Sequence, residues 1–164
     1  MPHIHDKIDF TAEVFVVHKD KVLLRKHDKY EVWLSVGGHI ELDEDPNEAA
    51  VREVKEEVGL DVVLADDLLP FKKRTLHYRE LIPPKYMNRH NPGGNNDGHE
   101  HVTLIYFGRS PTDAVVVPND HEKREEIKWF TREELEKNEY GVEETIRFYA
   151  LRALEELGQK NMGS

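Results

Sequence analysis

Residues 38–60 read GHIELDEDPNEAAVREVKEEVGL, and this glycine-bounded stretch contains six glutamates. Asp45 is a favourable N-cap residue, Pro46 suits the first helical position, and Glu48 follows three residues after the cap. Gly59 is typical of the position just past a helix end. The pattern therefore predicts a helix that begins at Pro46 and ends before Gly59.

The predicted helix has two distinct faces. Its apolar stripe, at the spacing of one helical face, comprises Ala50, Val51, Val54 and Val58. Another face carries Glu53, Glu56 and Glu57, although like charges at this spacing repel by a few tenths of a kcal/mol per pair and anions near a helix C-terminus oppose the macrodipole. A divalent cation with a preference for carboxylate oxygens would remove the conflict, so we interpret the cluster as a site for Mg²⁺ or Mn²⁺.

The spacing of the fixed positions resembles the Nudix box of the Nudix (MutT-like) hydrolase family. The matching residues are Gly38, Glu44, Arg52-Glu53-Val54, Glu56-Glu57 and Gly59-Leu60. Chance should produce such a match in a chain of this size with odds of roughly one in a million or less. The alternative is a solvated charged helix face. Ser35-Val36 stands where the commonest form of the box has Leu-Pro, a departure that leaves the carboxylates untouched.

The resemblance implies the α/β/α sandwich of this family, with a mixed β-sheet between helices. It also implies a metal-dependent pyrophosphohydrolase that cleaves a nucleoside diphosphate linked to another group X by attack of water on phosphorus. The expected cofactor is Mg²⁺, with Mn²⁺ as a substitute. In this sequence the implied metal ligands are the backbone carbonyl of Gly38 and the carboxylates of Glu53, Glu56 and Glu57. Arg52 matches the arginine that orients those glutamates, Glu44 the acid that supports the loop and helix, and a homodimer is a further expectation.

The rest of the chain shows a mixed order of strands and helices. A hairpin is expected from residues 10–17 and 22–25, further strands from 32–36, 61–64, 75–80, 102–107 and 123–130, a short helix from Thr131, and an amphipathic C-terminal helix over about 142–158. Trp33 is expected in the core. This order predicts a sheet covered by helices, and the length of 164 residues predicts one domain over 1–164.

Composition agrees with a small soluble enzyme. The net charge of −10 argues against general binding to nucleic acid or to anionic membranes. The sequence has no apolar run near the ~20 residues that span a bilayer, and its first residues lack the apolar stretch of a signal peptide, so a cytoplasmic location is expected. The absence of cysteine excludes disulfides and thiol chemistry.

Residues 71–101 are locally basic and contain several aromatic side chains. Cations can hold phosphates and rings can stack on a base, so this segment is a candidate for substrate recognition. The candidate substrate contacts are Arg79, Lys85, Tyr86 and Arg89, together with Arg25 at the end of the second predicted strand. The alternative is a surface insertion whose charges are solvated, with a flexible loop at 91–98.

The general base has several candidates outside the box, namely Glu100, Glu125 and Glu126. We favour Glu100, which lies in His99-Glu100-His101 at the start of a predicted strand. Two other interpretations of this trio are a solvated strand end and a separate His-x-His metal site. His3 and His5 are expected to be exposed.

Other functions on the same fold are less consistent with the sequence. A non-catalytic nucleotide sensor commonly loses box carboxylates, whereas all are present here. An isomerase of isopentenyl diphosphate uses a cysteine that this chain lacks, and regulators usually add a DNA-binding domain. The box is shared by enzymes acting on oxidised nucleoside triphosphates, ADP-ribose, nucleotide sugars, dinucleoside polyphosphates and capped RNA, so the identity of X stays open.

Overall fold

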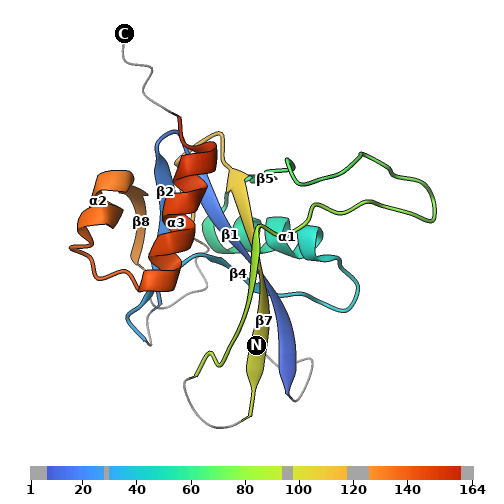
Figure 1. Cartoon of the computed structure of the whole chain (residues 1–164), viewed down its shortest axis with the longest axis horizontal. Coiled ribbons are helices and arrows are strands. Elements are labelled where there is room, and N and C mark those ends of the chain that lie inside the picture. Colours follow the sequence, from blue (N-terminus) through green and yellow to red (C-terminus); the bar gives the residue numbers. More distant parts are fainter. Residues whose placement is uncertain (1–6, 28–29, 94–97, 118–125, 160–164) are drawn as a thin grey trace.

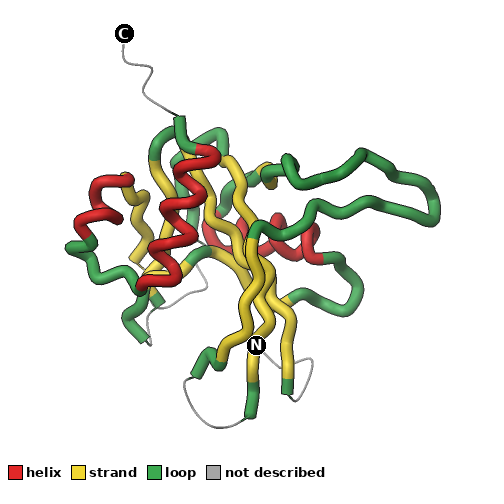
Figure 2. Tube along the Cα trace, in the orientation of Figure 1, coloured by secondary structure: helices red, strands yellow, loops and turns green. Residues whose placement is uncertain are grey.

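The computed structural model describes residues 7–27, 30–93, 98–117 and 126–159, which form eight strands and three helices (Figures 1 and 2). The strands are β1 (Ile8–His18), β2 (Lys21–Lys26), β3 (Trp33–Leu34), β4 (Val36–His39), β5 (Val63–Leu64), β6 (Tyr86–His90), β7 (Glu100–Arg109) and β8 (Glu126–Thr131). The helices are α1 (Pro46–Val58), α2 (Arg132–Lys137) and α3 (Glu144–Leu157). The helix expected over about 142–158 thus corresponds to α3.

All eight strands belong to one mixed sheet. β1 and β7 form its centre and run parallel, from Ile8 opposite Glu100 to Val17 opposite Arg109. The other pairings are antiparallel: β2 and β4 pair with β1, β5 and β6 with β7, and β3 and β8 with β2. The predicted mixed sheet is confirmed.

Each face of the sheet has its own hydrophobic core. On one face, Val14 and Val36 pack with Val54 of α1. On the other face, Phe15 and Phe107 pack with α3, and Leu135 of α2 joins the same core. Helices therefore cover both faces of the sheet, which confirms the α/β/α arrangement (Figure 1).

The β1–β2 hairpin and the core position of Trp33 are confirmed. Val17 pairs with Val22 and His18 with Lys21, which leaves a two-residue turn with Lys19 at φ 53°. Trp33 is buried, and its ring centroid lies 5.0 Å from that of Phe130 in an edge-to-face contact. The strand expected at 32–36 is divided into β3 and β4, on either side of Ser35.

Helix α1 begins and ends as its sequence predicts. The Asp45 carboxylate accepts the backbone N–H of Glu48 at 2.9 Å, and Gly59, at φ 70°, donates to the Lys55 carbonyl at 3.1 Å. Val51 was expected in the buried stripe, but 41% of it is exposed. The buried stripe of α1 is instead Ala49, Ala50, Glu53, Val54 and Val58, because Val51 lies one residue, or about 100°, beyond Ala50 around the helix.

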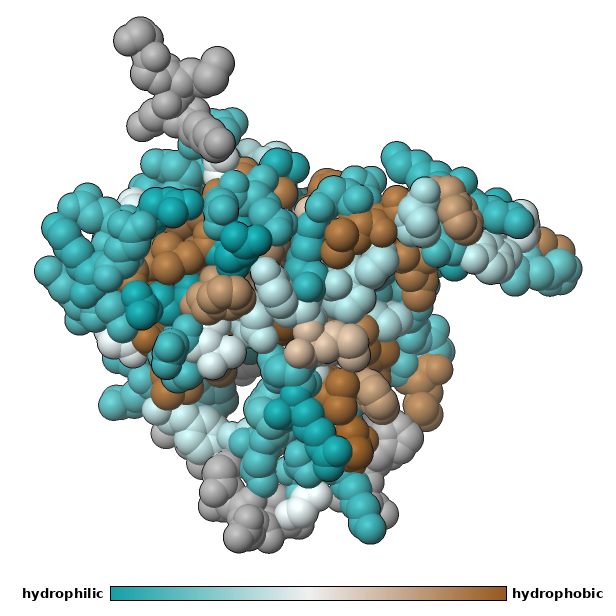
Figure 3. Space-filling view, in the orientation of Figure 1, coloured by the Kyte–Doolittle hydropathy of each residue, from teal (hydrophilic) through white to brown (hydrophobic). Residues whose placement is uncertain are grey.

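The strand predicted at 75–80 is wrong. Residues 65–85 form an extended arm between β5 and β6, which is mostly hydrophilic at its surface (Figures 2 and 3). In this arm a single bridge joins Arg74 to Arg79, and the backbone N–H of Thr75 donates to the Tyr78 carbonyl at 2.7 Å. Leu76 is 91% exposed, so the tip of the arm has no core against which a strand could pack.

The strand that pairs with β7 from this part of the chain is β6, which starts at Tyr86. Among the described residues no helix combines the length and the apolar character needed to cross a membrane. Residues 123–125 of the late predicted strand, residues 94–97 of the predicted loop, and His3 and His5 lie outside the described residues.

Candidate active site

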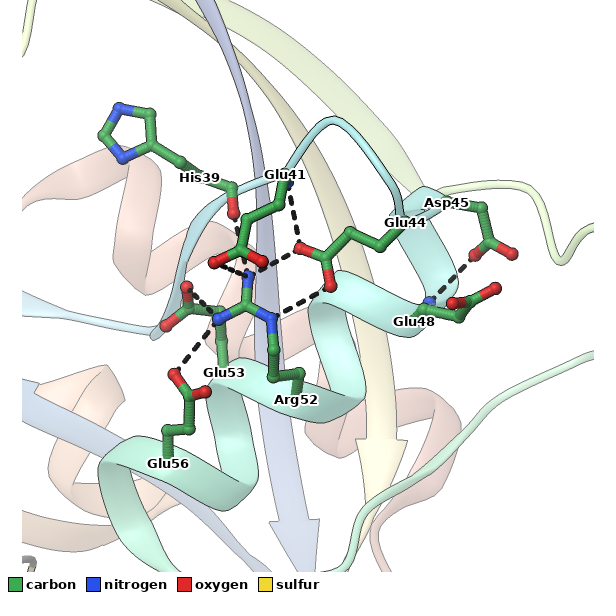
Figure 4. Close-up of polar contacts among 8 residues, drawn as sticks. All are labelled: His39, Glu41, Glu44, Asp45, Glu48, Arg52, Glu53 and Glu56. Atoms are coloured by element: carbon green, nitrogen blue, oxygen red, sulfur yellow. Dashed lines mark hydrogen bonds and ion pairs between the residues drawn. The ribbon is translucent and has the colours of Figure 1, made fainter. Parts of the chain in front are cut away.

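Arg52 is the centre of a network that joins α1 to the loop before it (Figure 4). Its guanidinium donates to both oxygens of Glu44, from Nε to Oε2 at 2.9 Å and from Nη2 to Oε1 at 2.6 Å. Nη2 also donates to the His39 carbonyl, and Nη1 donates to Glu53 and Glu56, each at 3.0 Å. A guanidinium is suited to this role because its five N–H donors form a rigid planar fork. The network fixes two of the box carboxylates relative to the loop.

Gly38 lies directly against the carboxylate of Glu53. A Cβ at Gly38 would lie 2.5 Å from Glu53 Oε1, and one at Gly37 would lie 2.2 Å from the Ala12 carbonyl oxygen. Neither glycine has a positive φ, so the unusual backbone angles that a turn there would need are absent. The requirement for glycine comes from the close approach of the chain to the carboxylate.

Electrostatics at the site follow from burial and from Arg52. Burial raises the pKa of Glu53, and the nearby charge of Glu56 adds to this, whereas Arg52 opposes both. The hydrogen bonds from Arg52 lower the pKa of Glu44. A buried carboxylate beside a second carboxylate costs free energy in the folded protein, and such a cost is common at functional sites.

Glu56 and Glu57 occupy different environments at the end of α1. Glu56 has a 60% exposed side chain, whereas Glu57 is partly buried and forms an ion pair with Arg25 of β2, from Oε2 to Nη2 at 3.3 Å. Arg25 in turn donates from Nε to the Ser35 carbonyl at 3.1 Å. Glu53 lies against the backbone at Gly38, Arg52 holds Glu53 and Glu56, and Glu57 is paired with Arg25, so the donors available at this end of α1 are oxygen atoms. This donor set fits a hard divalent cation such as Mg²⁺.

Glu13 also lies at the candidate site, although the sequence did not single it out. It lies on β1, accepts a hydrogen bond from Ser35 Oγ at 2.8 Å, and has a carboxyl group 2.7 Å from the position of a Cβ on Gly37. Burial raises its pKa, Arg25 lowers it, and the charge of Glu53 raises it further. A single acidic residue inside the apolar run 10–17 was the signal that could have identified it.

The cations and the aromatic residue predicted to bind substrate in residues 71–101 have partners within the protein. Arg79 pairs with Glu48 at 2.8 Å and Asp45 at 3.2 Å, at the opposite end of α1 from Glu57. Lys85 lies between Asp67 and Glu156, with its nitrogen 3.1 Å from the latter. The ring of Tyr86 packs against those of Phe107 and Tyr149, and its hydroxyl accepts from Arg152 at 3.3 Å. Their roles in substrate binding stay predictions.

Glu100 forms a two-point ion pair with Arg89. Both carboxylate oxygens accept from the guanidinium at 2.7 Å. Glu100 lies opposite Ile8 on β1, whereas Gly38 lies opposite Ala12, so four residues of strand, about 13 Å, separate the two along β1. Glu126 begins β8 opposite Lys26, and Glu125 lies outside the described residues. Of the general-base candidates, none among the described residues has a contact with a box carboxylate, and the assignment of Glu100 stays a prediction.

Comparison with known proteins agrees with this geometry. The family model for the NUDIX domain matches residues 9–151. The chain is similar to CTP pyrophosphohydrolase of Escherichia coli, with 27% identity over 63% of this chain and 77% of that protein. It is 37% identical to dihydroneopterin triphosphate diphosphatase of the same species, over 46% of this chain and 49%, about half, of that protein.

Solved structures show the same fold. A NUDIX-family hydrolase from Clostridium perfringens superposes with a TM-score of 0.74 and 32% identity, over 91% of this chain and 97% of that one. A MutT NUDIX hydrolase from Burkholderia pseudomallei superposes with a TM-score of 0.58 and 20% identity, over 92% and 98% of the two chains. The second likeness shows the fold alone.

Proposed function

Because the chain belongs to the Nudix hydrolase family, we propose that it hydrolyses the pyrophosphate bond of a nucleoside diphosphate linked to another group X. The observation that carries this proposal is the arrangement of Gly38, Arg52 and Glu53. A guanidinium fixes a buried carboxylate against a backbone that only glycine could bring so close. Burial of the Glu53 carboxylate costs free energy of folding, and the ion pair with Arg52 does not remove that cost. The arrangement is therefore better explained by a cation site than by stability alone.

The residues of the box have distinct tasks in this proposal. Glu53, Glu56 and Glu57, with the Gly38 carbonyl, would hold the divalent cation, for which we propose Mg²⁺ or Mn²⁺. The bound cation would neutralise phosphate oxygens and lower the pKa of the attacking water. Arg52 holds Glu53 and Glu56 in place through Nη1, and Glu44 fixes Arg52 through both of its oxygens.

Arg25 is the best supported substrate contact among the predicted ones. It lies beside Glu57, with which it forms an ion pair, and its side chain is largely buried. An arginine in this position is suited to a phosphate oxygen because its donors can bind two oxygens at once. The two named relatives act on CTP and on dihydroneopterin triphosphate, which supports a substrate with a chain of linked phosphates.

The test is product release from a panel of pyrophosphates in the presence of Mg²⁺ or Mn²⁺. The panel would hold CTP, dihydroneopterin triphosphate, ADP-ribose, a nucleotide sugar and a dinucleoside polyphosphate. The native chain would be compared with Glu57→Gln and with Glu48→Gln, a control that removes a carboxylate from the other end of the same helix. We expect selective cleavage of one substrate class, a loss of at least about a hundredfold in Glu57→Gln, and little change in Glu48→Gln.

Two other results would argue against hydrolysis by the box. Metal-dependent binding of a nucleotide without cleavage across the panel would support a non-catalytic binding module. Equal turnover by Glu57→Gln and the native chain would contradict the role of the box. A cytoplasmic location, a single domain over residues 1–164 and a homodimer stay predictions, and light scattering would measure the oligomeric state.

A further inference from the structure

One buried aspartate and four histidines form a cluster across neighbouring strands of the sheet, and His39, which follows Gly38, is the member that comes from residues 38–60. The members of this Asp9 cluster are Asp9, His39, His90, His99 and His101. Strand register brings them together: Asp9 on β1 lies opposite His101 on β7, and His101 lies opposite His90 on β6. His39 on β4 lies opposite Thr11, two residues from Asp9. Since opposite residues, and residues two apart in a strand, share a face, the sheet itself assembles this cluster.

The contacts within the cluster are short. Asp9 is 1% exposed, and its Oδ2 lies 3.2 Å from His39 Nε2 and 3.3 Å from His99 Nε2. The ring of His101 lies 5.0 Å from that of His39 and 5.3 Å from that of His99, between centroids. One ligand atom from each of Asp9, His39 and His101 lies within 4.8 Å of the others. Three elements of the sheet thus direct two imidazoles and a carboxylate to one point.

His101 is the member of the cluster whose environment most favours a ligand. Its Nε2 is buried and has no hydrogen-bond partner among the described residues. Burial, together with the charges of the neighbouring histidines, lowers the pKa of His101 to about 4. A buried polar atom without a partner costs free energy, and a bound cation would satisfy it.

We propose that Asp9, His39 and His101 form a binding site for a borderline divalent cation such as Zn²⁺, distinct from the cation site of the box. Two imidazole nitrogens and one carboxylate oxygen match the donors that Zn²⁺ takes in proteins, whereas Mg²⁺ prefers oxygen ligands throughout. His99 would not bind the cation itself. Its Nε2 lies 3.3 Å from Asp9 Oδ2 and would hold the Asp9 carboxylate in position. His39 follows Gly38 in the chain, but the two proposed sites have no ligand in common, because the His39 imidazole lies beside Asp9 whereas the box would use the Gly38 carbonyl and three glutamates.

The first test is Zn²⁺ titration of the full-length native chain against a chromophoric chelator, in excess Mg²⁺ to occupy the box. We expect one equivalent of Zn²⁺ that Mg²⁺ does not displace. The variants Asp9→Asn, which keeps the side-chain size, and His101→Asn, which removes the imidazole, should each weaken Zn²⁺ binding at least about tenfold. The control His77→Asn removes an exposed histidine in the arm and should bind like the native chain, as should the double variant His3→Asn/His5→Asn.

Three results would overturn the proposal. They are unchanged Zn²⁺ affinity in both Asp9→Asn and His101→Asn, loss of binding in the His3→Asn/His5→Asn variant, and displacement of Zn²⁺ by Mg²⁺. Since a variant of a buried residue can fail to fold, a second measurement uses the native chain alone. Anomalous diffraction at the zinc edge, from crystals grown with Zn²⁺ and Mg²⁺, should place an ion between Asp9, His39 and His101. A zinc peak at the box carboxylates alone would contradict the assignment.

Discussion

The box at residues 38–60 and the basic segment at residues 71–101 are both charged and both candidates for function by sequence, but their charged side chains have different surroundings in the structure. In the box, Arg52 binds the three carboxylates of Glu44, Glu53 and Glu56 together, and Glu53 also lies against Gly38. In the basic segment, the cations are divided among separate partners, for example Arg89 with Glu100. A cluster of like charges that the fold holds together indicates a functional site. Charged residues that each pair with an opposite charge give little indication of one.

The largest expected contrast separates two adjacent glycines in the box. A Cβ at Gly38 would meet the carboxylate of Glu53, whereas one at Gly37 would meet the backbone oxygen of Ala12 at 2.2 Å and the carboxyl group of Glu13 at 2.7 Å. We expect Gly38→Ala to reduce kcat/KM at least about a hundredfold, because it displaces Glu53. Gly37→Ala should mainly destabilise, by about 1–3 kcal/mol, because backbone atoms cannot move aside as a side chain can.

Thermal unfolding and steady-state kinetics of both variants measure this contrast. If Gly38→Ala and Gly37→Ala lost the same activity at equal stability, the close approach of Gly38 to Glu53 would not matter for the reaction.

The second contrast is between Arg52 and Arg79. Arg52→Lys keeps the charge but loses the two-point contact with Glu44 and the fork to Glu53 and Glu56, so kcat/KM should fall about 10- to 100-fold. Arg79→Lys is the matched control, because Arg79 contacts only exposed or partly exposed acids at the start of α1. Its kcat/KM should stay within about twofold of native. Full activity in Arg52→Lys would mean that the network does not position the box.

A third prediction uses the opposite pKa shifts of Glu53 and Glu44. Folding raises the pKa of Glu53, so its contribution to stability is greatest below the unfolded pKa, near 4.5, and falls as pH rises through the folded pKa. Without divalent cations, Glu53→Gln should therefore melt ~3 °C above the native chain at pH 7.5. At pH 4 this difference should be absent. Added Mg²⁺ should stabilise the native chain more than this variant.

Glu44→Gln should behave in the opposite way. Its pKa is lowered by Arg52, so Glu44 contributes stability above pH 4.5 that is lost as the pH falls through the folded pKa. The variant should melt below the native chain at pH 7.5 and approach it at low pH. Calorimetric melting temperatures, measured in the presence of a chelator across this pH range, would test both effects. The same dependence of melting temperature on pH in Glu53→Gln and Glu44→Gln would contradict the account of burial at the box.

The smallest effect is expected at Arg89. Arg89→Gln removes an exposed ion pair with Glu100, so KM and kcat should each change less than about twofold. The matched control is Glu100→Gln, which breaks the same pair from the other side. If Arg89→Gln instead raised KM about tenfold while Glu100→Gln did not, substrate would have to draw Arg89 away from its partner, and the predicted role in substrate binding would be supported.

Local spacing explains which features the sequence could predict. The caps of α1 involve residues a few positions apart in one helix, so capping chemistry and periodicity predicted them. The roles of Arg52 and Glu44 were implied by the resemblance to the box, and the contacts of Arg52 with Glu44, Glu53 and Glu56 agree with it. The sequence alone could not show which strands pair with one another. Glu13 reaches the site only because β1 pairs with β4, and the Asp9 cluster exists only because β1, β4, β6 and β7 align in register. The false strand at 75–80 had suitable residues but no core to cover it, since Leu76 is exposed.

The most direct test of the central claim is turnover of the preferred substrate in ¹⁸O-labelled water with Mg²⁺, followed by mass spectrometry of the products. The account predicts one ¹⁸O atom in a single phosphate product, formed by the native chain and by Glu48→Gln but at least about a hundredfold more slowly by Glu57→Gln. Products without ¹⁸O on phosphorus, or equal rates in the native chain and Glu57→Gln, would contradict it.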